Sequence, residues 1–348
     1  MRPYAFLLYP FSVLYNLITK IRNWLFDLGW LKSTPTPIPS ILVGNLSVGG
    51  TGKTPMVEYL IRNIKNQRKL ATLSRGYGRK SSGFLKADFS SSPAQIGDEP
   101  FQIFQKFGKE ISVFVGEKRL EAFQKISSNF PDVDLVVMDD AFQHRYVQAD
   151  LSILLTTFDR PFFADYLLPM GRLRESRSGA SRADMVVVTK TPNHANEKIK
   201  GQYHQMIKKY VDTDVPVLFS GIGYGEPYAL GQEIEFHPQV ILFSGLASDS
   251  HLKAHVSEHF EMLDVLTFSD HYEYQDSDFE KIRSLYLKYK SRNPVILTTE
   301  KDAVKVKFSA QEGILREIPI FVLPIQVEFP TEDAQQLERL IDQVILQK

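Results

Sequence analysis

The twelve residues from Gly44 to Pro55, GNLSVGGTGKTP, have the types and the spacing of a loop that could hold phosphate groups. They follow the apolar run 41–43 and precede a predicted helix over 56–64. Glycines let backbone N–H groups turn inward as a nest for anions, and the N-terminus of the helix adds the positive end of its dipole. Strand, loop and helix in this order favour a phosphate-binding loop over the alternative, a flexible surface loop without a ligand.

The position of each residue in this loop suggests its role. Lys53 is expected to reach the β- and γ-phosphates of a nucleotide, and Thr54 to offer its hydroxyl to Mg²⁺. The strict phosphate-loop pattern has glycine where this chain has Ser47, and Gly49 and Gly50 are expected to supply the flexibility instead. The residues expected to hold the nucleotide are Ser47, Val48, Gly49, Gly50, Thr51, Gly52, Lys53 and Thr54.

A pair of carboxylates, Asp139 and Asp140, follows the apolar run 135–138. An aspartate at the end of a buried strand, downstream of a phosphate loop, is typical of a Walker B segment, where it holds Mg²⁺ directly or through water. The alternative is that these aspartates only start the next helix. The following segment 141–145, AFQHR, which contains His144, places polar side chains at the same end of the sheet.

Asp98 and Glu99 stand where a helix over 98–107 is predicted to begin. Either could be a general base or a Mg²⁺ ligand beside the γ-phosphate; the alternative is that Asp98 only caps the helix. His271 follows a strand predicted to end at Phe268, and it could orient or deprotonate an attacking hydroxyl.

The charges of the chain balance overall but not locally. Lys and Arg together number 41, as do Asp and Glu, so the zero net charge disfavours wholesale nucleic-acid binding. The absence of cysteine excludes disulfides, thiol catalysis and cysteine-ligated metals. Two basic stretches, 59–87 and 172–182, suggest a face that meets a phosphorylated substrate or an acidic membrane; solvated helix faces are the alternative.

The N-terminal segment is an amphipathic sequence. Residues 3–19 carry no charge, and a helix over 11–28 would collect its polar residues in one stripe: Ser12, Asn16, Thr19, Lys20, Asn23 and Asp27. Such a stripe is typical of a helix lying in a membrane interface, with Trp24, Trp30, Lys20 and Arg22 at headgroup level. A spanning helix and a helix packed on the domain core are alternatives, and a signal peptide is disfavoured.

Apolar runs alternate with helical patterns along the rest of the chain, which predicts a doubly wound parallel sheet. Strands are expected at 41–43, 70–74, 111–115, 135–138, 151–155 and 185–188, and in a second part at 240–243, 262–268 and 295–299. A turn-rich stretch near 216–235 predicts a hinge or linker between two domains. The predicted domains are 1–35, an N-terminal membrane-interacting helix with its linker; 36–220, a phosphate-loop core; and 221–348, a smaller α/β domain.

Together these motifs resemble the tetraacyldisaccharide 4′-kinase family, the lipid A 4′-kinases of Gram-negative bacteria. The resemblance runs in order over most of the chain and is carried by 43–55, 74–79 (SRGYGR), 97–100 (GDEP), 139–145 (DDAFQHR), 168–175, 182–184, 269–271 and 299–302. The chain departs from the family pattern at Tyr272, where another histidine is common, and at Met170 and Arg172.

The resemblance implies an ATP- and Mg²⁺-dependent kinase that phosphorylates the 4′-hydroxyl of an acylated glucosamine disaccharide 1-phosphate, forming lipid IVA. It implies that the enzyme acts at the cytoplasmic face of the bacterial inner membrane and contacts the membrane surface through the N-terminal helix. It implies neither a nucleic acid nor an obligatory protein partner. Asp98 would be the base and His271 would tune it, while Lys53, Thr54, Glu99, Asp139 and Asp140 would serve the phosphates and Mg²⁺. Candidate ligands of the lipid phosphate or the transition-state charge are Arg75, Arg79, Arg119, His144, Arg172 and Arg174.

A different class of protein shares the phosphate-loop core, namely a GTPase or ATPase switch or a metallochaperone acting on a protein partner. Dimeric switch ATPases carry an additional lysine early in the loop, where this chain has Ser47 and Val48. The segments 189–190 and 298–302 only weakly resemble the base-reading motif of GTP-binding proteins. The sequence therefore favours the kinase.

Overall fold

A sheet of eight short strands organises the first part of the chain in the computed structural model, which describes residues 8–231, 234–246, 249–269, 272–311 and 313–346. The strand order is β10-β9-β8-β2-β6-β3-β5-β4, and every pair is parallel except the antiparallel edge pair β4–β5. The strands are β2 (Ser40–Asn45), β3 (Leu70–Ser74), β4 (Leu85–Lys86), β5 (Ser112–Val115), β6 (Leu135–Asp139), β8 (Leu151–Thr157), β9 (Met185–Thr189) and β10 (Val217–Phe219). A separate parallel pair joins β1 (Thr34–Pro35) to β7 (Val147–Gln148).

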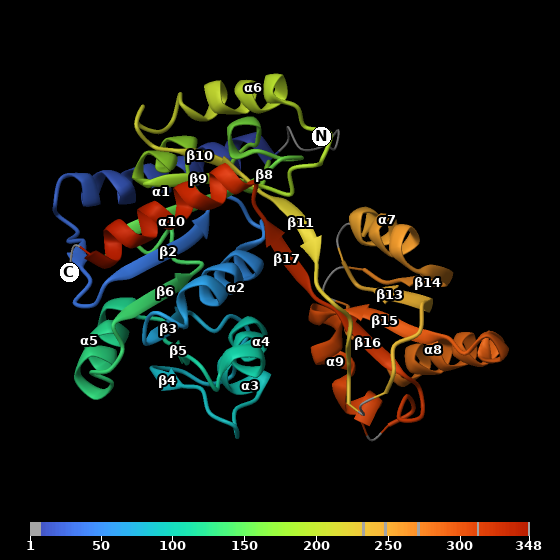
Figure 1. The fold of residues 1–348 in the computed structure, drawn as a ribbon. Helices are drawn as coiled ribbons and strands as arrows, with labels where there is room; N and C mark the ends of the chain where they lie inside the picture. Colours follow the sequence, from blue (N-terminus) through green and yellow to red (C-terminus); the bar gives the residue numbers. More distant parts are fainter. Residues whose placement is uncertain (1–7, 232–233, 247–248, 270–271, 312, 347–348) are drawn as a thin grey trace. The chain divides into compact units, whose positions relative to one another are not determined.

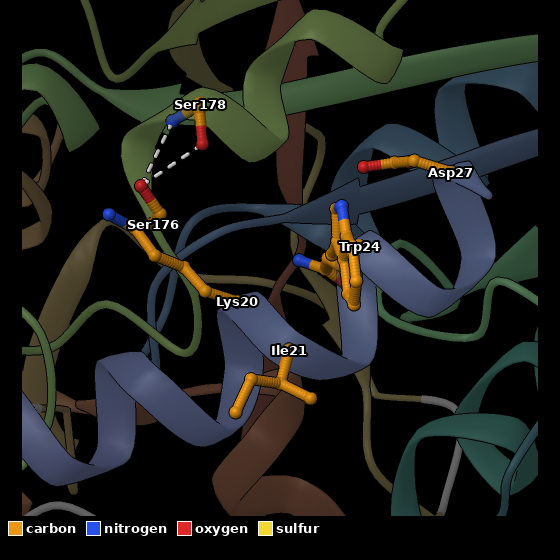
Figure 2. A pocket seen from close by; sticks show the side chains of 7 residues that line it. Lys20, Ile21, Trp24, Asp27, Ser176 and Ser178 are labelled. Carbon is orange, nitrogen blue, oxygen red and sulfur yellow. Dashed lines mark hydrogen bonds between the residues drawn. The ribbon is translucent and has the colours of Figure 1, made fainter.

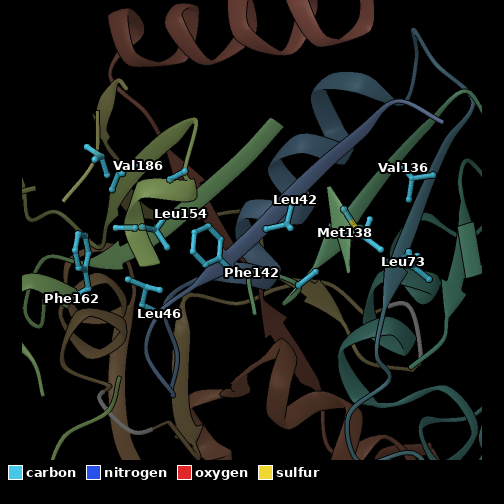
Figure 3. Packing of buried hydrophobic residues seen from close by; sticks show 14 of the residues in the cluster. Leu42, Leu46, Leu73, Val136, Met138, Phe142, Leu154, Phe162 and Val186 are labelled. Carbon is cyan, nitrogen blue, oxygen red and sulfur yellow. The ribbon is translucent and has the colours of Figure 1, made fainter. Parts of the chain in front are cut away.

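Helices cover both faces of this sheet, which is why its strands are almost continuously apolar. The helices of this part are α1 (Tyr9–Asp27), α2 (Lys53–Ile64), α3 (Pro93–Ile96), α4 (Asp98–Phe107), α5 (Arg119–Asn129), α6 (Glu197–Ile207) and α10 (Thr331–Leu346), with the 3₁₀ turns η2 (Phe162–Ala164) and η3 (Arg177–Arg182). Along β2, Ile41 and Val43 pack with α2, α4 and α10, whereas Leu42 belongs to the opposite core with α5 and α6. Figure 3 shows this second core around Leu42 and Phe142.

The first helix, α1, turns most of its polar stripe toward the core and most of its apolar residues outward, whereas Lys20 and Asp27 of the stripe are exposed. Ser12 is buried and its Oγ donates to the carbonyl of Leu167 (2.9 Å). Apart from the buried Phe26, most of the large apolar side chains of α1 and the turn after it are exposed: Phe11, Val13, Leu14, Leu17, Ile18, Ile21, Trp24, Leu28 and Trp30. None of the helices in the described ranges combines the length and the hydropathy that a membrane crossing needs. Ser12, Asn16 and Asn23 of the predicted stripe are at least partly buried against protein, and the place of α1 in a membrane interface stays a prediction.

A second compact unit comprises residues 223–326 and has a sheet of its own in the order β12-β16-β15-β13-β14. Its strands are β12 (Tyr228–Ala229), β13 (Gln239–Ser244), β14 (Glu261–Thr267), β15 (Val295–Thr299) and β16 (Ile320–Leu323), parallel except for β12. Its helices are α7 (Ser250–His259), α8 (Asp276–Lys288), η4 (Lys290–Arg292) and α9 (Glu300–Gln311). The chain passes between the units within β11 (Gly221–Tyr224) and β17 (Ile325–Glu328), which pair with each other (Figure 1).

This division differs from the predicted one at the C-terminus. The crossing at 222/223 lies close to the predicted boundary, but residues from Val327 onward belong to the first unit. Leu337 and Ile341 of α10 are buried against the core that contains Ile41. In addition, the backbone N–H of Phe219 donates to Asp333 Oδ2 (2.9 Å). The sequence pattern identified α10 as a helix but could not reveal which sheet its apolar face covers.

Candidate active site

The loop between β2 and α2 is held in shape by polar contacts at its base. Asn45 Nδ2 donates to Thr51 Oγ1 (2.7 Å), and Thr189 Oγ1 donates to the carbonyl of Thr51 (2.9 Å). Gly49 and Gly52 have φ of 110° and 84°, a conformation that glycine adopts without strain. These contacts fix the backbone conformation of the loop where it meets the N-terminus of α2, as binding of a phosphate group requires.

Residues 172–174 run beside this loop and bring two arginines, Arg172 and Arg174, close to it. The backbone N–H of Val48 donates to the carbonyl of Arg172 (2.8 Å), and the N–H of Arg174 donates to the carbonyl of Leu46 (2.7 Å). The side chain of Arg172 is exposed close to Gly49, since a Cβ at Gly49 would lie 3.6 Å from Arg172 Nη1. The structure thus gathers the loop and part of the second basic stretch into one site.

Lys53 and Asp140 meet at the first turn of α2. Lys53 Nζ lies 3.6 Å from Asp140 Oδ1, and the lysine side chain is only 11% exposed. Arg174 Nη1 donates to both oxygens of the same carboxylate, at 2.9 and 3.1 Å. Two cations on one carboxylate leave these three side chains with a net positive charge, which favours a polyphosphate.

Asp139, the neighbouring carboxylate, is buried at the end of β6, and its Oδ1 has no hydrogen-bond partner among the described residues. Burial, reinforced by the negative charge of Glu99, raises the pKa of Asp139 well above its ordinary value, although Lys53 opposes this. A buried carboxylate with one unpartnered oxygen is a costly arrangement, and a bound cation would lower that cost. The donor set of Asp139, Glu99 and the half-buried Thr54 is all oxygen and fits Mg²⁺.

The described residues contain no cluster of three or more His, Asp or Glu side chains in metal-binding geometry. That finding is compatible with Mg²⁺, which dehydrates reluctantly and is usually held by one or two carboxylates together with water and substrate phosphates. Asp139, Glu99 and Thr54 would hold the ion, and the ion would supply charge neutralisation at the phosphates.

Asp98 and Glu99 begin α4, directly after Gly97, whose φ is 94°. The turn 76–78 packs against this point, because a Cβ at Gly97 would lie 2.9 Å from the carbonyl oxygen of Tyr77. Both carboxylates are exposed, so Asp98 is accessible to an acceptor molecule. Glu99 faces Asp139 closely enough to influence its pKa.

The other predicted basic residues differ in accessibility. Arg75 is exposed, while Arg79 is largely buried and donates to Glu117 and to the carbonyl of Gly83. Arg119 is buried and donates to the carbonyl of Gly116. Burial lowers the pKa of Arg119 to about 10, an effect that nearby Asp139 opposes.

His144 is half-buried in the loop after β6. Burial and the positive charge of Arg119 lower the pKa of His144 to about 4, so its ring is neutral at neutral pH. A neutral imidazole can donate or accept one hydrogen bond to a sugar or a phosphate but cannot contribute charge. His271, the remaining candidate, lies outside the described residues.

The sequence pattern assigned no role to two polar residues that the structure connects to the site. Gln143 Nε2 donates to the carbonyl of Asn45 (2.7 Å), and Glu175 is a buried carboxylate directly after Arg174. A lone acid inside a basic stretch was the available signal for Glu175. A cavity of about 400 Å³ lies near it, between α1 and residues 176–178 (Figure 2).

Comparisons with known proteins identify the family of the chain. The profile of the family described as tetraacyldisaccharide-1-P 4′-kinase matches residues 4–346. The tetraacyldisaccharide 4′-kinase of Flavobacterium johnsoniae is 42% identical over 323 residues, which cover 90% of this chain and 91% of that protein. The enzyme of the same name from Cytophaga hutchinsonii is 40% identical over 348 residues, covering 97% and 95% of the two chains.

The fold is also similar to a solved structure across almost the whole chain. A crystal structure of LpxK from Aquifex aeolicus in complex with ATP superimposes with a TM-score of 0.75 at 30% sequence identity. The match covers 98% of this chain and 99% of the other. This likeness includes the phosphate-loop core and the second α/β unit alike.

Proposed function

The chain belongs to the tetraacyldisaccharide 4′-kinase family, and from that premise we propose which of its residues bind the nucleotide, the ion and the lipid. It is an ATP-dependent kinase that phosphorylates the 4′-hydroxyl of a tetraacyldisaccharide 1-phosphate in lipid A biosynthesis. The observation that carries the assignment of roles is the convergence of Lys53, Asp140 and Arg174 at the N-terminus of α2.

The nucleotide binds along the loop 47–54, its phosphates at backbone N–H groups from Gly49 to Thr54, because the N–H of Val48 already donates to the carbonyl of Arg172. Lys53 contacts the β- and γ-phosphates. Asp139, Thr54 and Glu99 hold Mg²⁺. Asp140 holds Lys53 and Arg174 in place, which is supported by its contacts with both. Phosphoryl transfer needs positioning and charge neutralisation more than covalent chemistry, and these residues provide both.

On the acceptor side, Asp98 takes the proton of the 4′-hydroxyl as it attacks, and His271 orients or tunes Asp98. The exposure of Asp98 at the start of α4 supports this role. Arg75 and Arg172 are the accessible candidates for the 1-phosphate or the charge that develops in the transition state. Arg79 and Arg119, whose guanidinium groups bind nearby carbonyls, shape the loops around them.

The outward apolar side of α1 lies in the surface of a lipid bilayer, on the cytoplasmic face of the inner membrane. An amphipathic helix binds an interface through the apolar area that it buries there. The inverted orientation of α1, with buried Ser12 and exposed Leu14, Leu17 and Ile18, supports this proposal. The acyl chains of the substrate would reach the enzyme from the same surface.

Replacing Leu17 with aspartate is expected to lower the partition coefficient onto anionic phospholipid vesicles by on the order of tenfold, because a charge replaces apolar area at the interface. Sedimentation with vesicles at high salt measures the effect. Leu287 on α8 is a matched control, since it is 51% exposed where Leu17 is 54% exposed. Equal loss in Leu17→Asp and Leu287→Asp would contradict the membrane role of α1.

Transfer of label from γ-labelled ATP, measured in detergent with and without a tetraacyldisaccharide 1-phosphate, tests the activity. A labelled lipid that forms only with the acceptor is expected. Hydrolysis of ATP or GTP at the same rate with and without the acceptor would point instead to a switch protein.

A further inference from the structure

Glu175 is a buried carboxylate, 3% exposed, on which three separate segments of the chain converge. Its Oε2 accepts a hydrogen bond from Asn23 Nδ2 of α1 (2.9 Å). Its Oε1 accepts from Gln143 Nε2 (3.1 Å) and from Arg182 Nη2 (2.8 Å). A buried carboxylate is costly without its partners, so the position of α1 and the position of the Glu175 side chain depend on each other.

Gln143 connects this carboxylate to the phosphate loop. Its Nε2 group, which donates to Glu175, also donates to the carbonyl of Asn45, where β2 passes into the loop. Its backbone carbonyl accepts from Arg22 Nη2 of α1 (3.0 Å). Gln143 is thus bonded to α1, to Glu175 and to the start of the loop at once.

Arg174 forms a second connection from α1 to the site. Tyr15 of α1 donates through its hydroxyl to the carbonyl of Arg174 (2.7 Å). The same residue donates through its backbone N–H to Leu46 and through its guanidinium to Asp140. Two paths of hydrogen bonds therefore lead from α1 to groups that touch Lys53 or the loop.

A helix that served only as an anchor would need its apolar side alone, and it could attach to the protein anywhere. We propose that Asn23 and Glu175 are positioning residues for phosphoryl transfer. Their hydrogen bond holds α1 in place. Through Gln143 and Arg174, it thereby fixes the start of the phosphate loop and the carboxylate of Asp140. This inference rests on the roles proposed above for Lys53 and Asp140. It makes α1 part of the catalytic apparatus as well as a surface for lipid.

The donor and acceptor of this bond can be exchanged, which gives a sharp test. Asn23→Asp places two carboxylates together, so the bond breaks and α1 is displaced. Adding Glu175→Gln restores the bond in reverse, because the new amide N–H₂ can donate to Asp while its oxygen still accepts from Gln143 and Arg182. Initial rates of lipid phosphorylation in detergent, with both substrates saturating, separate this effect from membrane binding.

Asn23→Asp is expected to lower kcat by about tenfold or more, since a displacement of about 1 Å at a distance from the chemistry can cost up to on the order of 10²-fold. The Asn23→Asp, Glu175→Gln double variant is expected to recover to within about threefold of the unmodified enzyme. Asn23→Ala removes the bond without adding charge, so its kcat should lie between those of Asn23→Asp and the double variant. This variant keeps the proposal testable if Asn23→Asp does not fold.

Asn16 offers the matched control. It lies on the same stripe of α1, and its buried Oδ1 has no hydrogen-bond partner among the described residues. Whatever Asn16→Asp does to kcat, Glu175→Gln should not repair it. The proposal is overturned if the double variant is no faster than Asn23→Asp, or if Asn23→Asp keeps full kcat in detergent and loses only its sedimentation with vesicles. Lipid phosphorylation by the unmodified enzyme in the same assay tests the activity itself independently.

Discussion

Replacing Lys53 with alanine is expected to lower the rate of lipid phosphorylation by on the order of 10³-fold, the scale found when one preorganised group that stabilises a transition state is removed. Lys53 Nζ lies 3.6 Å from Asp140 Oδ1, and the lysine side chain is 11% exposed. The ammonium group is therefore already positioned and largely shielded from bulk solvent before the nucleotide binds. Its interaction with phosphate is correspondingly stronger than in bulk solvent. Initial rates with γ-labelled ATP and saturating acceptor measure the loss.

The structure allows this loss to be separated from damage to the fold. Asp140 keeps two hydrogen bonds from Arg174 when Lys53 is removed, so the carboxylate is not left unpaired. Lys65, just beyond the last turn of the same helix, pairs with Glu110 at 2.6 Å and provides the control. Lys65→Ala should retain activity within about twofold, because a partly exposed ion pair of this kind contributes little.

A Lys53→Ala enzyme that kept more than a tenth of the activity would show that the phosphates are neutralised elsewhere, with Arg172 and Arg174 the first alternatives. Lys53→Arg discriminates further. The planar guanidinium has the same charge but a different reach and geometry. It should recover only a small part of the rate if the position of the cation matters as much as its sign.

The parts of the site that are local in sequence could be predicted from it. The loop from Ser47 to Thr54 is recognisable because its chemistry depends on neighbouring backbone groups, and Asp139 because it ends a buried strand. The order of strands and helices followed from apolar runs in the same way. These features require no knowledge of what packs against them.

The contacts between distant segments could not be predicted. Glu175 appeared only as a single acid among arginines, and nothing local indicates that it is buried beneath α1 and bonded to Asn23, 152 residues away in sequence. For α1, a polar stripe predicts amphipathicity but not which side faces protein. The placement of α10 on the first sheet could not be predicted for the same reason, because the apolar face of a helix does not specify which sheet it covers.

Replacing Asp98 with asparagine is expected to lower kcat by about 10²- to 10⁴-fold, the usual contribution of a general base. Asparagine keeps the size of the side chain at the start of α4 but cannot take the proton of the sugar hydroxyl. The loss should appear in kcat, with little change in the affinity for ATP, because Asp98 acts on the acceptor and not on the phosphate loop. Single-turnover rates and equilibrium nucleotide binding separate the two effects.

Loss of helix-dipole stabilisation is the competing explanation, because Asp98 is an acidic residue in the first turn of a helix. Glu332, an exposed first-turn acid of α10, controls for it, and Glu332→Gln should leave the rate within about twofold since such a charge is worth only about 0.3–1 kcal/mol. If Asp98→Asn lowers kcat by less than about tenfold, Asp98 is not the base. If His271→Ala gives an equal loss and the double variant is no slower than either single variant, Asp98 and His271 act as one unit, because the effects of residues that share a step are not additive.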